Sequence, residues 1–223
     1  MFENRDVKGI IWDLDNTLYR FNDAFIHACN IASARAAVKG GAPLGEDEAL
    51  SLSQQSFVET GRSGTYFIQR HGLSAEKLHH DYHGFVDEML IHGAAEVAEL
   101  FTGTPFEHAI ATHANHDWAR RALMRIGLAD FFPDSRIIAH ETAGFVSKDE
   151  GTLAFDLALA ALELEPDHVI VVEDTMRNLR VPFEMGCGTV FLHHGQVPEA
   201  LPEYVDVATG NAHSLLSTLA RTG

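Results

Sequence analysis

Two aspartates one residue apart, Asp13 and Asp15, follow an apolar run in the stretch KGIIWDLDNTLYRF, residues 8–21. Carboxylates held so close together repel each other, so we expect a cation or a division of roles to make the pair useful. A turn that begins at Leu14 would redirect the second carboxylate while its backbone carbonyl still reaches a metal ion. One aspartate could then attack a substrate while the other transfers protons.

Further polar groups stand at the ends of other apolar runs. Thr112 and His113 follow one run, Lys148 opens the helix that we expect after another, and Glu173 and Asp174 end a fourth. In a parallel sheet these groups would meet at one edge. Acidic clusters with only oxygen ligands favour Mg²⁺ over zinc. The hydroxyl, the ammonium and the backbone N–H groups of a turn would suit a phosphate.

The elements that must position these groups alternate along the chain. Helix-like patterns at 116–127 and 149–163 separate short apolar runs, which we predict to be strands at 8–14, 106–112, 135–139, 168–173 and 188–192, with a weaker candidate at 204–208. This alternation predicts an α/β protein with a Rossmann-like parallel sheet and helices on both faces. Ligands of such sheets bind at the carboxyl ends of the strands.

Residues 20–95 break the alternation. They contain helix-like patterns interrupted by KGGAP and TGRSGTY, without a convincing strand. A segment of this length is too long for a simple strand-to-helix crossover. We therefore predict an inserted all-helical cap domain over 20–95, above Asp13 and Asp15, with residues 1–19 and 96–223 forming the α/β core.

The composition limits the classes of partner. With 16 Lys and Arg against 32 Asp and Glu, the net charge is −16, which argues against a nucleic acid polymer as partner. The opening MFENRDVKG has no apolar signal region, and no segment approaches about 18 uncharged apolar residues, so we expect a cytoplasmic protein without membrane insertion. We expect Cys29 and Cys187 to be reduced structural thiols. A monomer and a homodimer both remain open.

Four motifs, in order, resemble those of the haloacid dehalogenase-like phosphatase superfamily. They are DLDNT at 13–17, ATH at 111–113, SKDEG at 147–151 and VVEDT at 171–175. Within the superfamily, WDLDNTLY, the helical insertion and EDTMRNL are most similar to the pyrimidine 5′-nucleotidase-like subgroup. The resemblance extends over essentially the whole chain.

The resemblance implies a hydrolase of phosphoric monoesters that acts through an aspartyl-phosphate. Asp13 would be the nucleophile, and Asp15 would act first as general acid and then as general base. Thr112 and Lys148 would hold the phosphoryl oxygens. His113 stands where the family commonly has Asn, and we count it among the substrate-binding residues.

The resemblance also implies a Mg²⁺ site. Its ligands would be Asp13, the backbone carbonyl of Asp15 and Asp174, with help from Glu173, which replaces a more common Asp. The substrate would be a small phosphate ester, with a pyrimidine nucleoside 5′-monophosphate as the leading class. Pro182 falls where related chains form a smooth helix, so we expect that helix to start late or to kink.

Several alternatives stay open at this stage. A dehalogenase shares the nucleophile but needs neither a metal nor a second aspartate, while a phosphoglycolate or sugar phosphatase and a phosphomutase would use the same motifs. A phospho-accepting signalling domain also combines Asp, Thr, Lys and Mg²⁺, but it would leave Asp15 and the cap without a purpose. Arg62, in a glycine-rich cap loop, is either a substrate contact or a surface residue. His79 and His83 lie four residues apart, which fits a solvated helix face better than a metal site.

Overall fold

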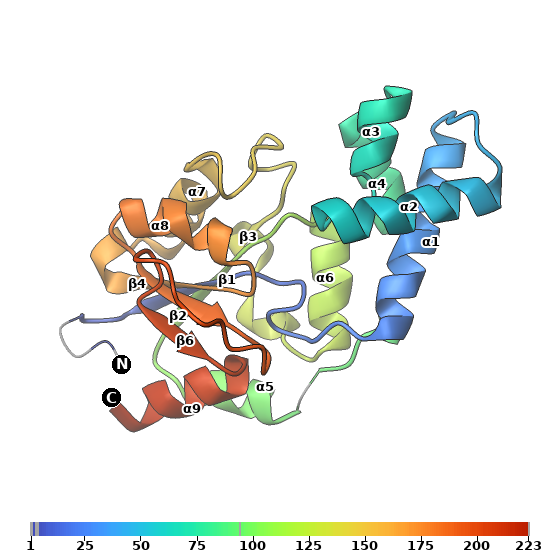
Figure 1. Cartoon of the computed structure of the whole chain (residues 1–223). Coiled ribbons are helices and arrows are strands. Elements are labelled where there is room, and N and C mark those ends of the chain that lie inside the picture. The colour runs from blue at the N-terminus through green and yellow to red at the C-terminus, as the bar shows by residue number, and fades with distance from the viewer. Residues whose placement is uncertain (1, 3–4, 94, 223) are drawn as a thin grey trace. The chain divides into compact units, whose positions relative to one another are not determined.

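The computed structural model describes residues 2, 5–93 and 95–222. Its centre is one six-stranded sheet in the order β3-β2-β1-β4-β5-β6, in which every neighbouring pair is parallel (Figure 1). The strands are β1 (Gly9–Trp12), β2 (Glu107–Ala111), β3 (Ile137–Ile138), β4 (Val169–Glu173), β5 (Gly188–Leu192) and β6 (Val207–Thr209). The predicted Rossmann-like α/β fold is therefore confirmed, and each predicted run overlaps a strand, although β6 begins and ends later than the predicted run at 204–208.

Strand β1 lies in the middle of the sheet, between β2 and β4. Trp12 is level with Ile110 on one side and with Val172 on the other. The next residue, Asp13, continues the ladder because its N–H donates to the carbonyl of Val172 at 2.9 Å. This register places the residues that follow the three central strands at a common edge of the sheet.

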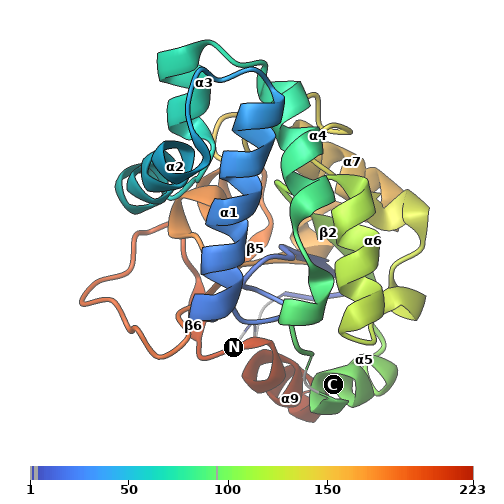
Figure 2. The same cartoon turned by 90° about the vertical axis from the view of Figure 1, so that its right-hand side faces the viewer.

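Helices cover both faces of this sheet. Alternate strand residues, such as Ile11, pack against α7 (Leu153–Leu162), whose Phe155 is fully buried. On the other face, the ring of Trp12 lies 5.4 Å from that of Phe101 on α5 (Ala95–Thr102). Helix α5 lies beside α9 (Ala212–Thr222), as Figures 1 and 2 both show. The remaining helices of this part are α6 (His116–Arg125) and α8 (Arg180–Glu184), with 3₁₀ helices η2 (Ala129–Phe131), η3 (Asp134–Arg136), η4 (Pro166–His168) and η5 (Met176–Leu179).

The segments after β3 and β4 bear on two local expectations. The prediction that Lys148 opens a helix is wrong: it lies in a turn, and α7 begins only at Leu153. The segment after β4 begins as η5, and an α-helix starts only at Arg180, with Pro182 two residues further on. Proline is tolerated there because the first turn of a helix needs no N–H donors for internal bonds.

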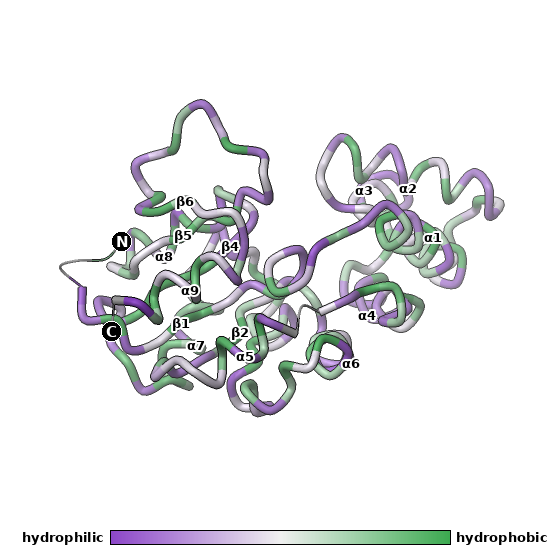
Figure 3. The backbone as a smooth tube through the Cα atoms, turned by 90° about the horizontal axis from the view of Figure 1, so that it is seen from below, coloured by the Kyte–Doolittle hydropathy of each residue, from purple (hydrophilic) through white to green (hydrophobic). Residues whose placement is uncertain are grey.

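The chain divides into two compact units, Met1–Arg20 with His92–Gly223, and Phe21–Ile91. The second unit consists of α1 (Asp23–Lys39), α2 (Glu46–Thr60), α3 (Thr65–His71), α4 (Ala75–Phe85) and the 3₁₀ helix η1 (Glu88–Leu90). It has a core of its own, in which Phe67 and Leu78 are buried among alanines of α1. Figure 3 shows both hydrophobic and hydrophilic residues along the tube of α4, whose Leu78 is buried in this core. None of the helices in the described part of the chain is long and apolar enough to cross a membrane.

Candidate active site

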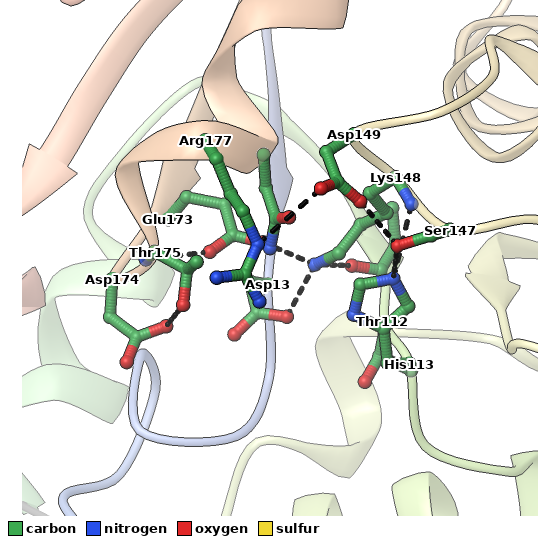
Figure 4. A network of polar contacts seen from close by, with 12 residues as sticks. Asp13, Thr112, His113, Ser147, Lys148, Asp149, Glu173, Asp174, Thr175 and Arg177 are labelled. Atoms are coloured by element: carbon green, nitrogen blue, oxygen red, sulfur yellow. Dashed lines mark hydrogen bonds and ion pairs between the residues drawn. The ribbon is translucent and has the colours of Figure 1, made fainter. Parts of the chain in front are cut away.

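Lys148 and Asp13 form the centre of a polar network at the carboxyl ends of the strands (Figure 4). The Lys148 ammonium donates to Asp13 Oδ1 at 2.6 Å, to the carbonyl oxygen of Ala111 at 3.0 Å, and to Glu173 Oε1. Lys148 is only 1% exposed. One buried cation therefore joins the ends of β1, β2 and β4.

Glu173 and Asp174 are each held by further donors. Glu173 Oε1 also accepts from the side-chain amide of Asn178 at 2.8 Å, and Oε2 accepts from the N–H of Thr175 at 2.9 Å. Asp174 Oδ2 accepts from the amide of Asn16 at 2.7 Å. Asn16 adopts a left-handed backbone conformation, φ 62°, which Asn tolerates better than most residues. Both acidic side chains therefore have fixed orientations.

Carboxylates outnumber cations at this centre. Asp13, Glu173 and Asp174 each offer an oxygen, and these atoms lie within 4.8 Å of one another. Burial is the main reason why the pKa of Asp174 is raised to about 6, and the charge of Glu173 adds to it. Burial likewise raises the pKa of Asp13, against the opposing effect of Lys148. A further cation would relieve this repulsion.

The donor set fits Mg²⁺. All three side chains supply hard oxygen atoms, and neither a thiolate nor an imidazole belongs to the group. Asp13 has the most coordinating capacity left, because within the described residues only its Oδ1 accepts a hydrogen bond, whereas Glu173 accepts three and each oxygen of Asp174 accepts one, from Thr175 or Asn16. Lys148 stays cationic, since its two carboxylate partners raise its pKa against the effect of burial.

Thr112 and His113 follow β2 at the same edge. Thr112 Oγ1 accepts from the N–H of Ala114 at 3.0 Å, and within the described residues the hydroxyl donates no hydrogen bond, so its proton is available to a further acceptor. His113 Nε2 accepts from the N–H of Lys148 at 3.1 Å. Since a backbone N–H can only donate, Nε2 carries no proton, and the neutral ring has its proton on Nδ1. His113 thus supports the backbone of Lys148, a contact that its place in the sequence did not indicate.

Asp15 forms hydrogen bonds with residues outside the network of Lys148. Its Oδ1 accepts from the indole N–H of Trp118 at 2.9 Å and from the hydroxyl of Tyr19. Burial raises the pKa of Asp15, and these two donors oppose the shift. Sequence reasoning placed Trp118 in the helix-like pattern at 116–127 and missed its contact with Asp15.

A second group missed by sequence reasoning surrounds Asp149. Its carboxylate accepts from the hydroxyl of Ser147 and pairs with Arg177 Nε at 3.4 Å, while its carbonyl accepts from Arg180 at 3.0 Å. Figure 4 shows Arg177 reaching from the segment after β4 towards Asp149. These contacts connect the turn of Lys148 with the segment after Asp174. The motifs SKDEG and EDTMRNL contain Ser147, Asp149 and Arg177 but did not indicate their pairing, and Arg180 directly follows the second motif.

Arg62 belongs to the unit Phe21–Ile91, and its side chain is exposed. Its carbonyl accepts from the hydroxyls of Ser56 at 2.6 Å and Thr60 at 3.1 Å, which fix the backbone of this loop. A role for Arg62 in substrate binding remains a prediction. In the same unit, His83 is buried, and its Nδ1 donates to the carbonyl of His79 at 2.8 Å. That hydrogen bond gives the His83 ring a structural role. The expectation of a solvated helix face is wrong for His83, because this residue is only 6% exposed.

The comparison with protein families agrees with this geometry. The model of the haloacid dehalogenase-like hydrolases matches residues 7–181, which include Asp13, Lys148 and Asp174. The chain belongs to the haloacid dehalogenase-like hydrolases. Among curated proteins, none matches the chain.

Solved structures with the same fold have diverse activities. CbbY from Rhodobacter sphaeroides, in complex with phosphate, has a TM-score of 0.68 at 17% identity, over 94% of this chain and 96% of that one. The putative HAD-hydrolase YfnB from Bacillus subtilis, bound to magnesium, has a TM-score of 0.63 at 18% identity, over 96% and 99%. The L-2-haloacid dehalogenase from Xanthobacter autotrophicus has a TM-score of 0.61 at 16% identity, over 97% and 99%. Identities this low establish the fold of the hydrolase and leave its reaction open.

Proposed function

We propose that this hydrolase cleaves phosphoric monoesters in a Mg²⁺-dependent reaction through an aspartyl-phosphate. The observation that carries the proposal is the buried contact of Lys148 with Asp13 and Glu173, beside Asp174. Three acidic groups and one ammonium leave the site with excess negative charge, which would repel an anionic substrate. Such a substrate fits only if a further cation is present. The match to the hydrolase family and the phosphate-bound neighbour CbbY are compatible with this chemistry.

In the proposed first step, a carboxylate oxygen of Asp13 attacks phosphorus and the P–O bond to the alcohol breaks. Asp13 Oδ2 suits this attack, because the only hydrogen bond of the side chain within the described residues is between Oδ1 and Lys148. Asp15 donates a proton to the departing alkoxide, which leaves as an alcohol. Asp15 then takes a proton from water as the water attacks the acyl phosphate, which returns Asp13 and releases inorganic phosphate.

The substrate would be held by the hydroxyl of Thr112 and by the positive charge of Lys148. Thr112 would donate its hydroxyl proton to a phosphoryl oxygen, while the Lys148 ammonium would compensate the charge of the same group. Asp13, Asp174 and the carbonyl of Asp15 would hold Mg²⁺, with Glu173 as a further acidic neighbour. The bound ion would supply neutralisation of the phosphoryl charge.

We propose a nucleoside 5′-monophosphate, with a pyrimidine base, as the leading substrate class. The support is the similarity of WDLDNTLY and EDTMRNL to the pyrimidine 5′-nucleotidase-like subgroup. A phosphoglycolate or sugar phosphatase and a phosphomutase are the alternatives that use the same residues. A dehalogenase is less well supported, because hydrolysis of a carbon–halogen bond would leave Asp15 and the acidic pair Glu173 and Asp174 without a role.

One assay separates these activities. Purified protein with Mg²⁺ is offered nucleoside monophosphates, sugar phosphates, phosphoglycolate and a 2-haloacid, and both phosphate and halide release are measured. We expect phosphate release that stops with excess chelator and returns with Mg²⁺. Ca²⁺ should inhibit, because its looser coordination tolerates geometries that misalign the attack. Undiminished turnover in chelator, or halide release without phosphate release, would contradict the proposal.

A further inference from the structure

We infer that Trp118 and Tyr19 are positioning residues that hold one oxygen of Asp15 and thereby present its other oxygen for proton transfer. The inference rests on the proposed function, in which Asp15 is the general acid and base. Trp118 Nε1 and the Tyr19 hydroxyl both donate to Oδ1 of Asp15. Within the described residues, Oδ2 makes no hydrogen bond.

The indole of Trp118 is held rigidly. It lies in the first turn of α6, where Asn115 caps the helix by accepting the N–H of Trp118 at 2.8 Å. The side chain is buried, with only 2% of the residue exposed, and the Arg121 guanidinium lies 5.1 Å from its ring centroid. A donor with so little freedom can fix the orientation of its acceptor.

The hydroxyl of Tyr19 reaches Asp15 through a local turn. The Leu14 carbonyl accepts from the N–H groups of Thr17 and Leu18 at 3.2 and 3.0 Å, so the chain coils once after the nucleophile. Residues four apart lie on the same side of such a turn, which brings Tyr19 against Asp15. Tyr19 is only 4% exposed, so this donor is also fixed.

The two donors determine which oxygen of Asp15 is left for a substrate. Oδ1 accepts both hydrogen bonds, so Oδ2 is the oxygen available for the proposed proton transfer. Without the two donors, the carboxyl group could rotate and offer either oxygen in several orientations. The hydrogen bonds from Trp118 and Tyr19 would therefore aid proton transfer by orienting the carboxyl group of Asp15, and orientation accounts for large effects in catalysis.

The first test compares substrates with different leaving groups. Trp118→Phe and Tyr19→Phe each remove one donor and keep an aromatic ring. An alkyl phosphate needs protonation of its leaving group, whereas an activated aryl phosphate needs little. We expect each variant to slow alkyl phosphate turnover by about 10- to 100-fold, which is less than the loss of roughly 10²- to 10⁴-fold expected when the acid–base group itself is removed. Attack on the aryl phosphate should fall less, so phosphorylated protein should accumulate under acid quench.

The matched control is Tyr66→Phe, which removes a tyrosine hydroxyl that donates to the carboxylate of Glu59. It deletes the same type of hydrogen bond in the other unit. We expect this variant to turn over both substrates at the rate of the parent protein. The second test repeats Trp118→Phe in a protein that already carries Asp15→Asn. A positioning role predicts no further loss there, whereas a merely structural role predicts the same loss in both backgrounds.

A spectroscopic measurement tests the contact apart from activity. The chain has two tryptophans, so its ¹⁵N spectrum contains two indole N–H signals, and Trp118→Phe identifies one of them. Asp15→Asn should shift the Trp118 signal much more than that of Trp12, which donates to His108. If Asp15→Asn shifts the Trp118 signal but the parent protein releases no phosphate, the contact is confirmed, whereas the proposed function and the catalytic role are contradicted. An unshifted signal, equal losses for alkyl and aryl substrates, or faster turnover in both variants would overturn the inference.

Discussion

Lys148 joins three strand ends through a single ammonium group. It donates to the carboxylates of Asp13 and Glu173 and to the carbonyl of Ala111, and none of these contacts is open to solvent. Removing one member of such a buried set leaves the others with uncompensated charge. The same residue therefore contributes to stability and to the proposed binding of a phosphoryl group.

Replacement of Lys148 by alanine tests the stabilising part of this role. We expect Lys148→Ala to lower the free energy of unfolding by about 3 kcal/mol, since it leaves Asp13 and Glu173 buried without their cation. Urea denaturation at neutral pH measures the change. Lys8→Ala is the matched control, because Lys8 pairs with Asp6 on the surface, where such bonds contribute about 0–1 kcal/mol. Equal effects of the two substitutions would mean that the buried charges are compensated in another way.

The proposed division of roles between the two aspartates can be tested by intact mass. Asp13→Asn should abolish turnover and form no phosphorylated protein, because the nucleophile is lost. Asp15→Asn should slow alkyl phosphate turnover by roughly 10²- to 10⁴-fold, since only the proton transfer is lost. With an activated aryl phosphate, it should accumulate one phosphoryl group under rapid acid quench. Turnover of alkyl phosphates by Asp15→Asn at the parent rate would refute this division.

At the scale of elements, the packing of α5 on β2 contains an ionisable group. His108 of β2 is 4% exposed, and its Nδ1 accepts from the indole N–H of Trp12 at 3.2 Å. Its ring lies 4.5 Å from that of Phe101 on α5. Burial lowers the pKa of His108 from 6.5 to about 4, so the folded protein keeps this side chain neutral.

The lowered pKa of His108 predicts a loss of stability in acid. The unfolded chain binds a proton at His108 below pH 6.5, whereas the folded protein binds it only near pH 4. The stabilisation is therefore complete above pH 6.5 and is lost as the pH falls towards 4, by about 3 kcal/mol in total. His108→Gln should remove this part of the pH dependence in urea titrations between pH 7 and 4.5. The control is His213→Gln, which changes an exposed histidine on α9 and should leave the pH dependence of the free energy of unfolding as in the parent protein. An unchanged pH dependence in His108→Gln would contradict the prediction.

At the scale of the whole molecule, the chain has two units, each with a core of its own. The unit with the sheet contains the acidic centre, which consists of Asp13, Glu173 and Asp174. It also contains Lys148 and the contacts of Asp15. The helical unit holds Arg62 in a loop whose backbone is fixed by Ser56 and Thr60. We propose that the sheet unit carries out the reaction and that the helical unit acts as a cap that selects substrates.

Arg62→Ala tests the selective role of the helical unit. If Arg62 contacts the leaving group, its loss should reduce kcat/KM for a nucleoside monophosphate by about 10-fold or more while a generic aryl phosphate changes little. The ranking of substrates in the panel is the measurement. Arg70→Ala is a useful control, because Arg70 stacks on the ring of Tyr66 in the same unit. A uniform effect on all substrates, or none, would assign Arg62 to the surface.

The sequence by itself determined the sheet and much of the acidic centre. Runs such as Val169–Glu173 are short and rich in β-branched residues, which predicts strands of a parallel sheet, and the structure shows this run buried throughout. The polar residues directly after these runs then had to meet at one edge, because parallel strands share their carboxyl ends. Asp13, Lys148, Glu173 and Asp174 do lie together there.

Only the tertiary structure decided which of these groups bond to one another. Trp118 reaches Asp15 across 103 residues, and His113 accepts from the N–H of Lys148 across 35. Hydrophobic periodicity predicts which face of a helix is buried, but it carries no information on which polar atom of a buried side chain meets which partner. That choice depends on the strand order and on side-chain orientations, which are set when the helices pack on the sheet.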